Sequence, residues 1–90
     1  MKIMKTIKRY EIAGGRLSYE LVESMSEGYV CFGVKVSTTL FGETESAYVE
    51  DVSSIYEKAE RFFDIIADNA VLPCTLKDIA EDYVSEECMV

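Results

Sequence analysis

The chain has 90 residues and a formal net charge of −8; 49% of its residues are hydrophobic and 29% are charged. This length allows one domain, residues 1–90, with a small core. The composition excludes a disordered tail and a low-complexity segment. The negative charge repels a phosphate backbone, so we expect no nucleic-acid partner.

The charge is uneven along the chain. Residues 1–35 contain six basic and four acidic side chains, whereas residues 36–90 contain three basic and thirteen acidic ones. The basic residues near the start alternate with apolar ones, so we interpret them as the solvated side of a strand. The longest apolar runs, 29–32 and 70–74, are far shorter than the ~20 residues of a membrane helix. We therefore expect no membrane partner.

Two extended runs open the chain, over residues 3–12 and 17–23. Between them lies Ala13-Gly14-Gly15-Arg16, whose glycines favour the positive φ angles of a tight hairpin. A polar loop is expected over residues 24–28. The first half of the chain therefore begins as an antiparallel pair of strands.

Residues 29–38 predict a central strand, because their stronger apolar face is β-branched. That face comprises Val30, Phe32, Val34 and Val36. A turn is expected over residues 40–43 and a last strand over residues 45–52. Since every connection is short, the simplest arrangement is a four-stranded antiparallel meander.

A first helix is predicted over residues 54–70, because Ser54 and Glu57 have the spacing of a capping box. Its apolar stripe comprises Ile55, Ala59, Phe62, Phe63, Ile66 and Ala70. We expect Phe62, Phe63 and Ile66 to meet Val30, Phe32 and Val34 of the central strand. The helix should end near Asn69 or Ala70, since Pro73 cannot continue it.

A second, shorter helix is predicted over residues 75–84. Thr75 is expected to cap it, which places Asp78 at the third helical position. Its inward face comprises Leu76, Ile79, Ala80 and Tyr83, and residues 85–90 should fray. The predicted fold class is therefore α+β, with the meander followed by two C-terminal helices on one face of the sheet.

The sequence argues against enzymatic chemistry. It contains no His, which removes the usual acid–base residue and any triad-type hydrolysis. No GxGxxG, GxxxxGK[ST] or GxSxG motif occurs, so we expect no nucleotide or other cofactor. The three Cys lack a CxxC pairing, which is typical of reduced thiols in a cytoplasm.

Two kinds of residue leave an alternative open. Cys74 precedes the second predicted helix, and a helix N-terminus favours a thiolate. It also ends an apolar run, where free Cys is commonly buried, so we favour packing. The pairs Asp64 with Asp68 and Asp78 with Asp82 stand one turn apart and can bind Mg²⁺ or Ca²⁺ weakly. We interpret these carboxylates as solvated.

A specific pattern follows the first predicted helix. It reads Asn-x-Val-x-Pro and then Leu-x-Asp-x-x-x-Asp, formed by Asn69, Val71, Pro73, Leu76, Asp78 and Asp82. With its β-rich first half, the chain resembles a family of short uncharacterised proteins from clostridia-like Gram-positive bacteria, a domain of unknown function. The resemblance implies a cytoplasmic bacterial protein with no assigned activity, and it transfers no catalytic residue.

Two functions from different classes fit this sequence. We expect a non-catalytic, cytoplasmic protein-interaction or regulatory module that docks to another protein or to itself. The alternative is a small ligand- or divalent-metal-binding protein, or an enzyme, that uses Cys74 or the acidic helix residues. The candidate interaction surface comprises Tyr29, Cys31, Tyr48, Asp78 and Asp82.

Self-association follows from the two sides of the sheet. Two helices can cover only one side, which leaves Tyr29, Cys31 and Gly33 pointing away from them. Tyr10 or Tyr48 is expected to join these residues in a mixed aromatic surface. A twofold homodimer would cover that surface. The competing interpretation is a water-facing side with scattered tyrosines.

Overall fold

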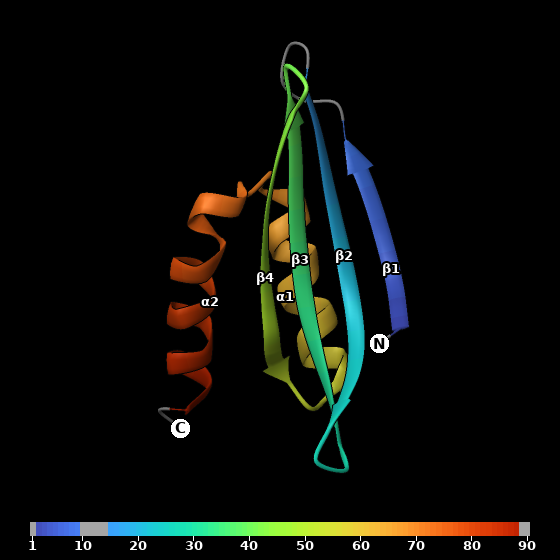
Figure 1. Ribbon diagram of the computed structural model, residues 1–90. Helices are drawn as coiled ribbons and strands as arrows, with labels where there is room; N and C mark the ends of the chain where they lie inside the picture. Colours follow the sequence, from blue (N-terminus) through green and yellow to red (C-terminus); the bar gives the residue numbers. More distant parts are fainter. Residues whose placement is uncertain (1, 10–14, 89–90) are drawn as a thin grey trace.

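A computed structural model describes residues 2–9 and 15–88 of the chain. Its elements are β1 (Lys2–Arg9), β2 (Gly15–Ser26), β3 (Tyr29–Leu40), β4 (Glu43–Ser53), α1 (Tyr56–Asp68) and α2 (Pro73–Cys88). The strands form one antiparallel sheet in the order β1-β2-β3-β4. Figure 1 shows α1 behind the sheet and α2 beside β4. The predicted α+β meander with two C-terminal helices is therefore confirmed.

Tight turns join the last three strands. Glu27 and Gly28 have φ angles of 52° and 83°, and Phe41 and Gly42 have φ angles of 50° and 83°. Two successive positive φ angles are characteristic of a type I′ turn, which suits the twist of long strands. The connection lies within the loop predicted over residues 24–28 but is shorter, because pairing continues to Ser26 and only Glu27 and Gly28 form the turn. The glycine hairpin predicted around residues 13–16 lies largely outside the described residues, as does Tyr10.

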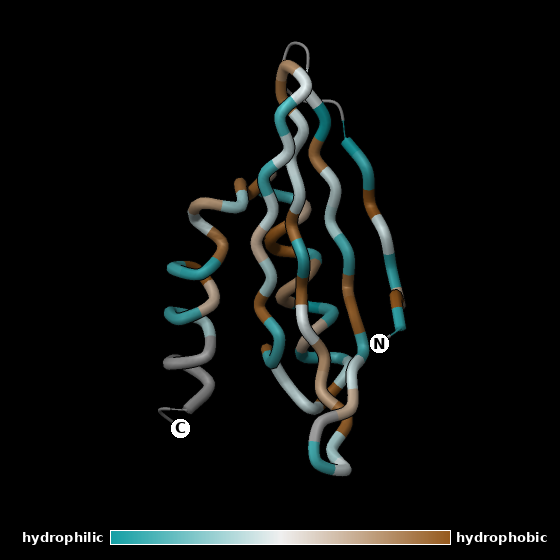
Figure 2. The backbone as a smooth tube through the Cα atoms, in the orientation of Figure 1, coloured by the Kyte–Doolittle hydropathy of each residue, from teal (hydrophilic) through white to brown (hydrophobic). Residues whose placement is uncertain are grey.

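One face of the sheet forms the core with both helices. The buried cluster includes Leu17, Tyr19, Leu21, Phe32, Val34, Val36, Val52, Ala59, Phe62, Phe63, Ile66, Leu76 and Ala80. Figure 2 shows hydrophobic and hydrophilic residues alternating along the strands. That alternation directs every second side chain to the helices, as the sequence predicts.

Val30 departs from the predicted core. It lies on the same face as Phe32 and Val34, but its side chain is 38% exposed. Phe32 instead marks the end of the covered face, where its ring packs edge-on against Tyr56 at a centroid distance of 5.5 Å. The contact expected between Val30 and α1 is therefore wrong, because Val30 lies closer to the projecting end of the hairpin.

The first helix does not use the predicted capping box. Helix α1 begins at Tyr56, and the capping position is Ile55, which has no side-chain cap bond. The Ser53 hydroxyl accepts the Ile55 backbone N–H at 3.0 Å, while the Ile55 side chain is 50% exposed. The predicted end is confirmed, because Asn69 is the C-terminal cap.

The second helix starts earlier and runs further than predicted. Pro73 occupies the first helical position, where its missing N–H costs nothing. Thr75 therefore lies inside the first turn and donates to the Leu72 carbonyl at 3.1 Å. Asp78 lies beyond that turn, and the helix continues to Cys88 instead of fraying after residue 84.

Hydroxyl groups connect the layers. The buried Tyr19 side chain on β2 donates to the carbonyl oxygen of Val71 at 3.2 Å, in the connection between the helices. Tyr83 on α2 donates to the carbonyl oxygen of Lys58 on α1 at 3.4 Å. Its ring also packs against Phe62 at a centroid distance of 5.0 Å. Tyr83 therefore faces inward, as predicted.

Gly33 marks a close approach between β3 and β4. Regular pairing is interrupted here, between the pairs Phe32 with Ser53 and Val34 with Val49. A Cβ atom at Gly33 would lie 2.6 Å from the carbonyl oxygen of Glu50 and would also overlap the carbonyl oxygen of Val49. Only glycine fits this position, because the obstructing atoms belong to the backbone.

Candidate interaction surfaces

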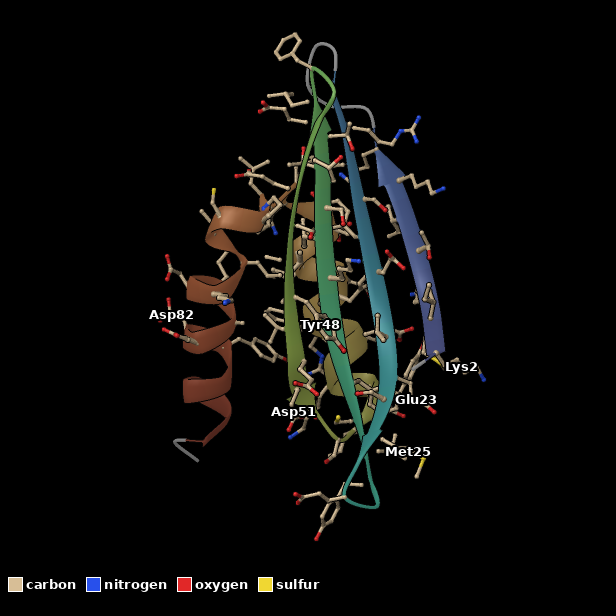
Figure 3. The ribbon with its side chains drawn as sticks, in the orientation of Figure 1. Lys2, Glu23, Met25, Tyr48, Asp51 and Asp82 are labelled. Atoms are coloured by element: carbon tan, nitrogen blue, oxygen red, sulfur yellow. The ribbon has the colours of Figure 1, made fainter. Side chains whose placement is uncertain are left out.

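The face of the sheet opposite the helices, here called the open face, holds two of the predicted interaction residues together. Tyr48 of β4 is the register partner of Lys35, and Cys31 of β3 is the partner of Ser24. The Ser24 hydroxyl and the Cys31 thiol lie 3.2 Å apart. Figure 3 shows the Tyr48 side chain across the front of β3.

On the open face, side chains of the sheet itself bury some of their neighbours. Val22 and Cys31 are buried although no helix lies over them. The Tyr48 hydroxyl is also buried, and no group in the described part of the chain meets hydrogen-bond geometry with it. Burial raises the pKa of Tyr48, and the nearby Ser24 hydroxyl partly offsets that rise. Cys31 is therefore shielded, not presented to a partner.

Tyr29 belongs to a different surface, the end of the hairpin formed by β2 and β3. We call this surface the β2–β3 tip, defined by residues 25–30. Met25 and Tyr29 are 71% and 73% exposed, and Val30 pairs directly with Met25. Figure 1 shows this hairpin projecting beyond the ends of β1 and β4. Met25 and Val30 share one face of the hairpin and Tyr29 lies on the other, so the β2–β3 tip presents apolar side chains to solvent on both of its faces.

The basic residues of β1 contact α1. Lys5 Nζ donates to Glu60 Oε2 at 3.1 Å, and the Tyr56 hydroxyl donates to the same oxygen at 2.9 Å. The bond from Tyr56, followed by that from Lys5, lowers the pKa of Glu60. The bond to Glu60 raises the pKa of both Lys5 and Tyr56. These three groups hold the edge strand against the helix.

Two further ion pairs extend this contact. Lys5 Nζ lies 3.8 Å from Asp64 Oδ1, and an Arg9 guanidinium nitrogen lies 3.6 Å from Asp68 Oδ1. The prediction that the basic residues near the start are merely solvated is therefore wrong for Lys5 and Arg9. The uneven charge of the sequence is partly neutralised within the fold.

Asp78 and Asp82 lie on α2, whereas the other three residues of the predicted interaction surface lie on the sheet. Both are exposed, and neither forms an ion pair within the described residues. Figure 3 shows Asp82 on the outer side of α2 and Tyr48 on the sheet. The five predicted interaction residues therefore occupy three surfaces: the open face, the β2–β3 tip and α2.

Cys74 is exposed, so the prediction that it packs in the core is wrong. Pro73, beside it, is the buried residue at this point. Across residues 2–9 and 15–88, no group of three His, Cys, Asp or Glu side chains is arranged to hold a metal ion. Within the same described part, no helix is both long and apolar enough to cross a membrane.

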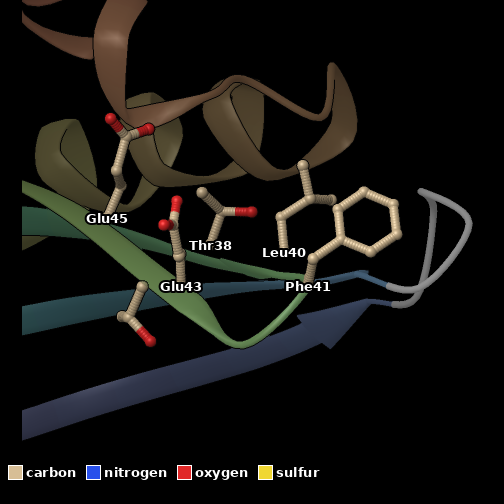
Figure 4. A pocket seen from close by; sticks show the side chains of 6 residues that line it. Thr38, Leu40, Phe41, Glu43 and Glu45 are labelled. Carbon is tan, nitrogen blue, oxygen red and sulfur yellow. The ribbon is translucent and has the colours of Figure 1, made fainter.

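A pocket of about 570 Å³ lies at the end of the hairpin formed by β3 and β4. We call this end the β3–β4 tip, defined by residues 38–45. The pocket is lined by Thr38, Leu40, Phe41, Glu43, Thr44 and Glu45. Figure 4 shows Thr38, Leu40, Glu43 and Glu45 on the same side of the hairpin.

Sequence reasoning missed the exposed side chains of Met25 and Phe41 and the buried hydroxyl of Thr38. A signal was present for two of them, because Met25 and Phe41 are large apolar residues inside segments predicted to be a loop and a turn. Such residues have little core to enter, so exposure is the expected result. No sequence signal distinguishes Thr38, since threonine is common on either face of a strand.

Comparison with known proteins identifies the family and nothing finer. The profile of the family described as "Family of unknown function (DUF6514)" matches residues 1–86. No curated protein and no solved structure matches the chain. The match covers all six elements except the last residues of α2. The chain therefore belongs to this family of unknown function, DUF6514.

Proposed function

We propose that this chain is a non-catalytic protein-interaction module that docks through the β2–β3 tip. The observation that carries the proposal is the exposure of Met25 and Tyr29 on a hairpin that projects from the sheet. Met and Tyr are enriched where proteins meet, because they bury large apolar surface. A paired hairpin also presents them at little further cost in backbone entropy.

The partner we propose is a different protein with an apolar site and a basic rim. Glu23 and Glu27 lie on this hairpin, and Figure 3 shows Glu23 beside Met25. A second copy would bring the same carboxylates against these, and like charges in contact disfavour association. Charge complementarity therefore favours a basic partner over a homodimer at this surface.

Neither the edges of the sheet nor the groups with shifted pKa values offer a better docking surface than the β2–β3 tip. Both edge strands carry an irregularity in pairing, between Ile3 and Lys5 and between Phe32 and Val34 opposite β4. Such irregularities blunt edges against strand addition. Lys5, Tyr48, Tyr56 and Glu60 have shifted pKa values, and these four residues join β1 to α1 or cover the open face, away from the β2–β3 tip.

We place the module in a bacterial cytoplasm. The described thiols of Cys31 and Cys74 are free, as expected in a reducing compartment. The resemblance of residues 69–82 to clostridial proteins supports the same location.

The proposal is tested by site-specific photo-crosslinking. A photoreactive amino acid placed at Met25 in the full chain should form a discrete conjugate in an extract of the native cell. The same amino acid at Ile65, an exposed apolar position on α1, is the matched control. We expect the conjugate from position 25 alone.

Binding measurements with the purified partner then test whether the β2–β3 tip is the docking surface. Replacing Met25 and Tyr29 together by Ser should weaken its binding by about 100-fold, as expected for two central apolar contacts. Replacing Ile65 and Leu72 by Ser should leave binding within about twofold, since these exposed residues lie on the helical side. Equal loss in both variants contradicts the proposal. So does a conjugate of twice the 10.2 kDa chain mass, which would identify a second copy.

A further inference from the structure

The pocket at the β3–β4 tip lies at the opposite end of β3 from the proposed docking surface. Its lining combines two carboxylates, two hydroxyls and two apolar side chains. Glu43 and Glu45 form no ion pair within residues 2–9 and 15–88. The pocket therefore carries negative charge that the described part of the fold leaves uncompensated.

Besides its acidic residues, the pocket has a buried hydroxyl, that of Thr38, without a hydrogen-bond partner among the described residues. Thr38 is 8% exposed and is the one buried polar residue of the described part of the chain. Its hydroxyl oxygen makes no hydrogen bond there. A buried hydroxyl without a partner costs free energy, and it requires an explanation that packing does not supply. The Thr38 side chain lines the pocket on the same side of the hairpin as Glu43 and Glu45 (Figure 4).

Phe41 adds a second feature. Its ring is 82% exposed, and its φ angle of 50° lies in the left-handed region. The first position of a type I′ turn favours Asn, Asp or Gly, so neither turn geometry nor packing selects phenylalanine. An aromatic ring beside two carboxylates can contact both the alkyl chain and the charge of an organic cation.

We propose that this pocket binds an alkylammonium group, either a lysine side chain of another protein or a free amine. The ammonium N–H groups donate to Glu43, Glu45 and the Thr38 hydroxyl, and the alkyl chain lies against Leu40 and Phe41. Three acceptors match the three donors of an ammonium group. This site is separate from the β2–β3 tip, so its test does not depend on the docking proposal.

The test is a titration of the full ¹⁵N-labelled chain with hexylammonium chloride, followed by NMR. We expect saturable shifts confined to the amides of residues 38–45. Hexanol, which has the same chain without the charge, should shift them weakly and without saturation. Capped lysine amide and spermidine, added separately, then distinguish a protein side chain from a free polyamine as the natural source.

Three variants test which side chains of the pocket contact the ammonium ligand. Replacing Glu43 and Glu45 together by Gln should weaken hexylammonium binding by about tenfold or more. Glu50→Gln combined with Asp51→Asn removes two charges elsewhere on β4 and should not weaken it. Thr38→Val replaces the hydroxyl by a methyl group of similar size and should weaken binding while the chain keeps or gains thermal stability. Phe41→Asn preserves the turn and should also weaken binding.

Two results overturn the proposal. One is the absence of saturable shifts in residues 38–45. The other is equal binding of hexanol and hexylammonium, which would show that the pocket takes apolar chains regardless of charge. Unchanged affinity in Thr38→Val would remove Thr38 from the site and contradict the three-acceptor arrangement.

Discussion

The hydroxyl of Tyr19 on the central part of β2 donates a hydrogen bond to the carbonyl oxygen of Val71 at 3.2 Å. Both residues are buried. This bond ties the sheet to the connection between α1 and α2, where the chain reverses. It therefore fixes where the second helix begins relative to the sheet.

Tyr19→Phe should destabilise the fold by about 1–3 kcal/mol, because it leaves a buried carbonyl without its donor. Urea unfolding followed by circular dichroism measures the loss. Tyr83→Phe is the control: its bond to Lys58 is longer, at 3.4 Å, and only partly buried, so its loss should be smaller. Equal losses would show that the Tyr19 bond has no special role.

Gly33→Ala should destabilise the fold by at least about 1–3 kcal/mol, the usual cost of overpacking. The added Cβ would meet backbone oxygens of β4, which cannot turn aside as a side chain can. Gly28→Asn is the matched control, because its φ of 83° is left-handed and no atom lies within 4 Å. Asn tolerates that conformation, so the control should melt close to the parent. An unchanged melting temperature for Gly33→Ala would contradict the close approach.

The pH dependence of stability should include Glu60. Its pKa is lowered from an ordinary value of 4.5, so its contribution is present above that value and disappears as the pH falls through the lowered pKa. Glu60→Gln should therefore melt below the parent at neutral pH, and the difference should shrink on acidification. Glu81→Gln on α2 is the control. A difference independent of pH would exclude the ionised bond.

The contribution of Lys5 to stability has the opposite pH dependence to that of Glu60. The pKa of Lys5 is raised from 10.5, so its contribution is present below that value and is lost as the pH rises through the raised pKa. The stability difference between the parent and Glu60→Gln should therefore shrink again in strong alkali.

Thiol accessibility should separate two cysteines. Cys74 is exposed and Cys31 is buried beside Ser24. In a Cys88→Ser background, iodoacetamide should alkylate Cys74 in the folded chain and reach Cys31 only after denaturation. Peptide mass spectrometry reports both positions. Equal alkylation of the two would show that the open face does not shield Cys31.

The sheet and its buried face were predictable because alternation assigns each strand residue to one side. Val34, Phe63 and Leu76 all lie in the core as their periodicity indicates. Alternation does not show where the helices stop covering that face. Val30 continues the same pattern as Val34 but lies beyond α1, so its exposure depends on tertiary placement.

Helix starts were predicted less well, for a local reason. Ser54 has the right spacing to cap α1, yet β4 continues to Ser53, and that residue accepts the N–H of Ile55 instead. The sequence predicts that Pro73 lies between the two helices, but it begins α2 because proline suits a first helical position. The displaced start brings Cys74 to the surface. It also moves Asp78 out of the first turn.

The order of the strands in the sheet has a consequence for folding kinetics. Each strand pairs with its neighbour in sequence, so the sheet requires only local loop closure and can form rapidly. The helices that cover its apolar face come last in the chain. During synthesis the sheet face must therefore remain uncovered until α1 and α2 emerge, and association between nascent chains is most favourable in that interval.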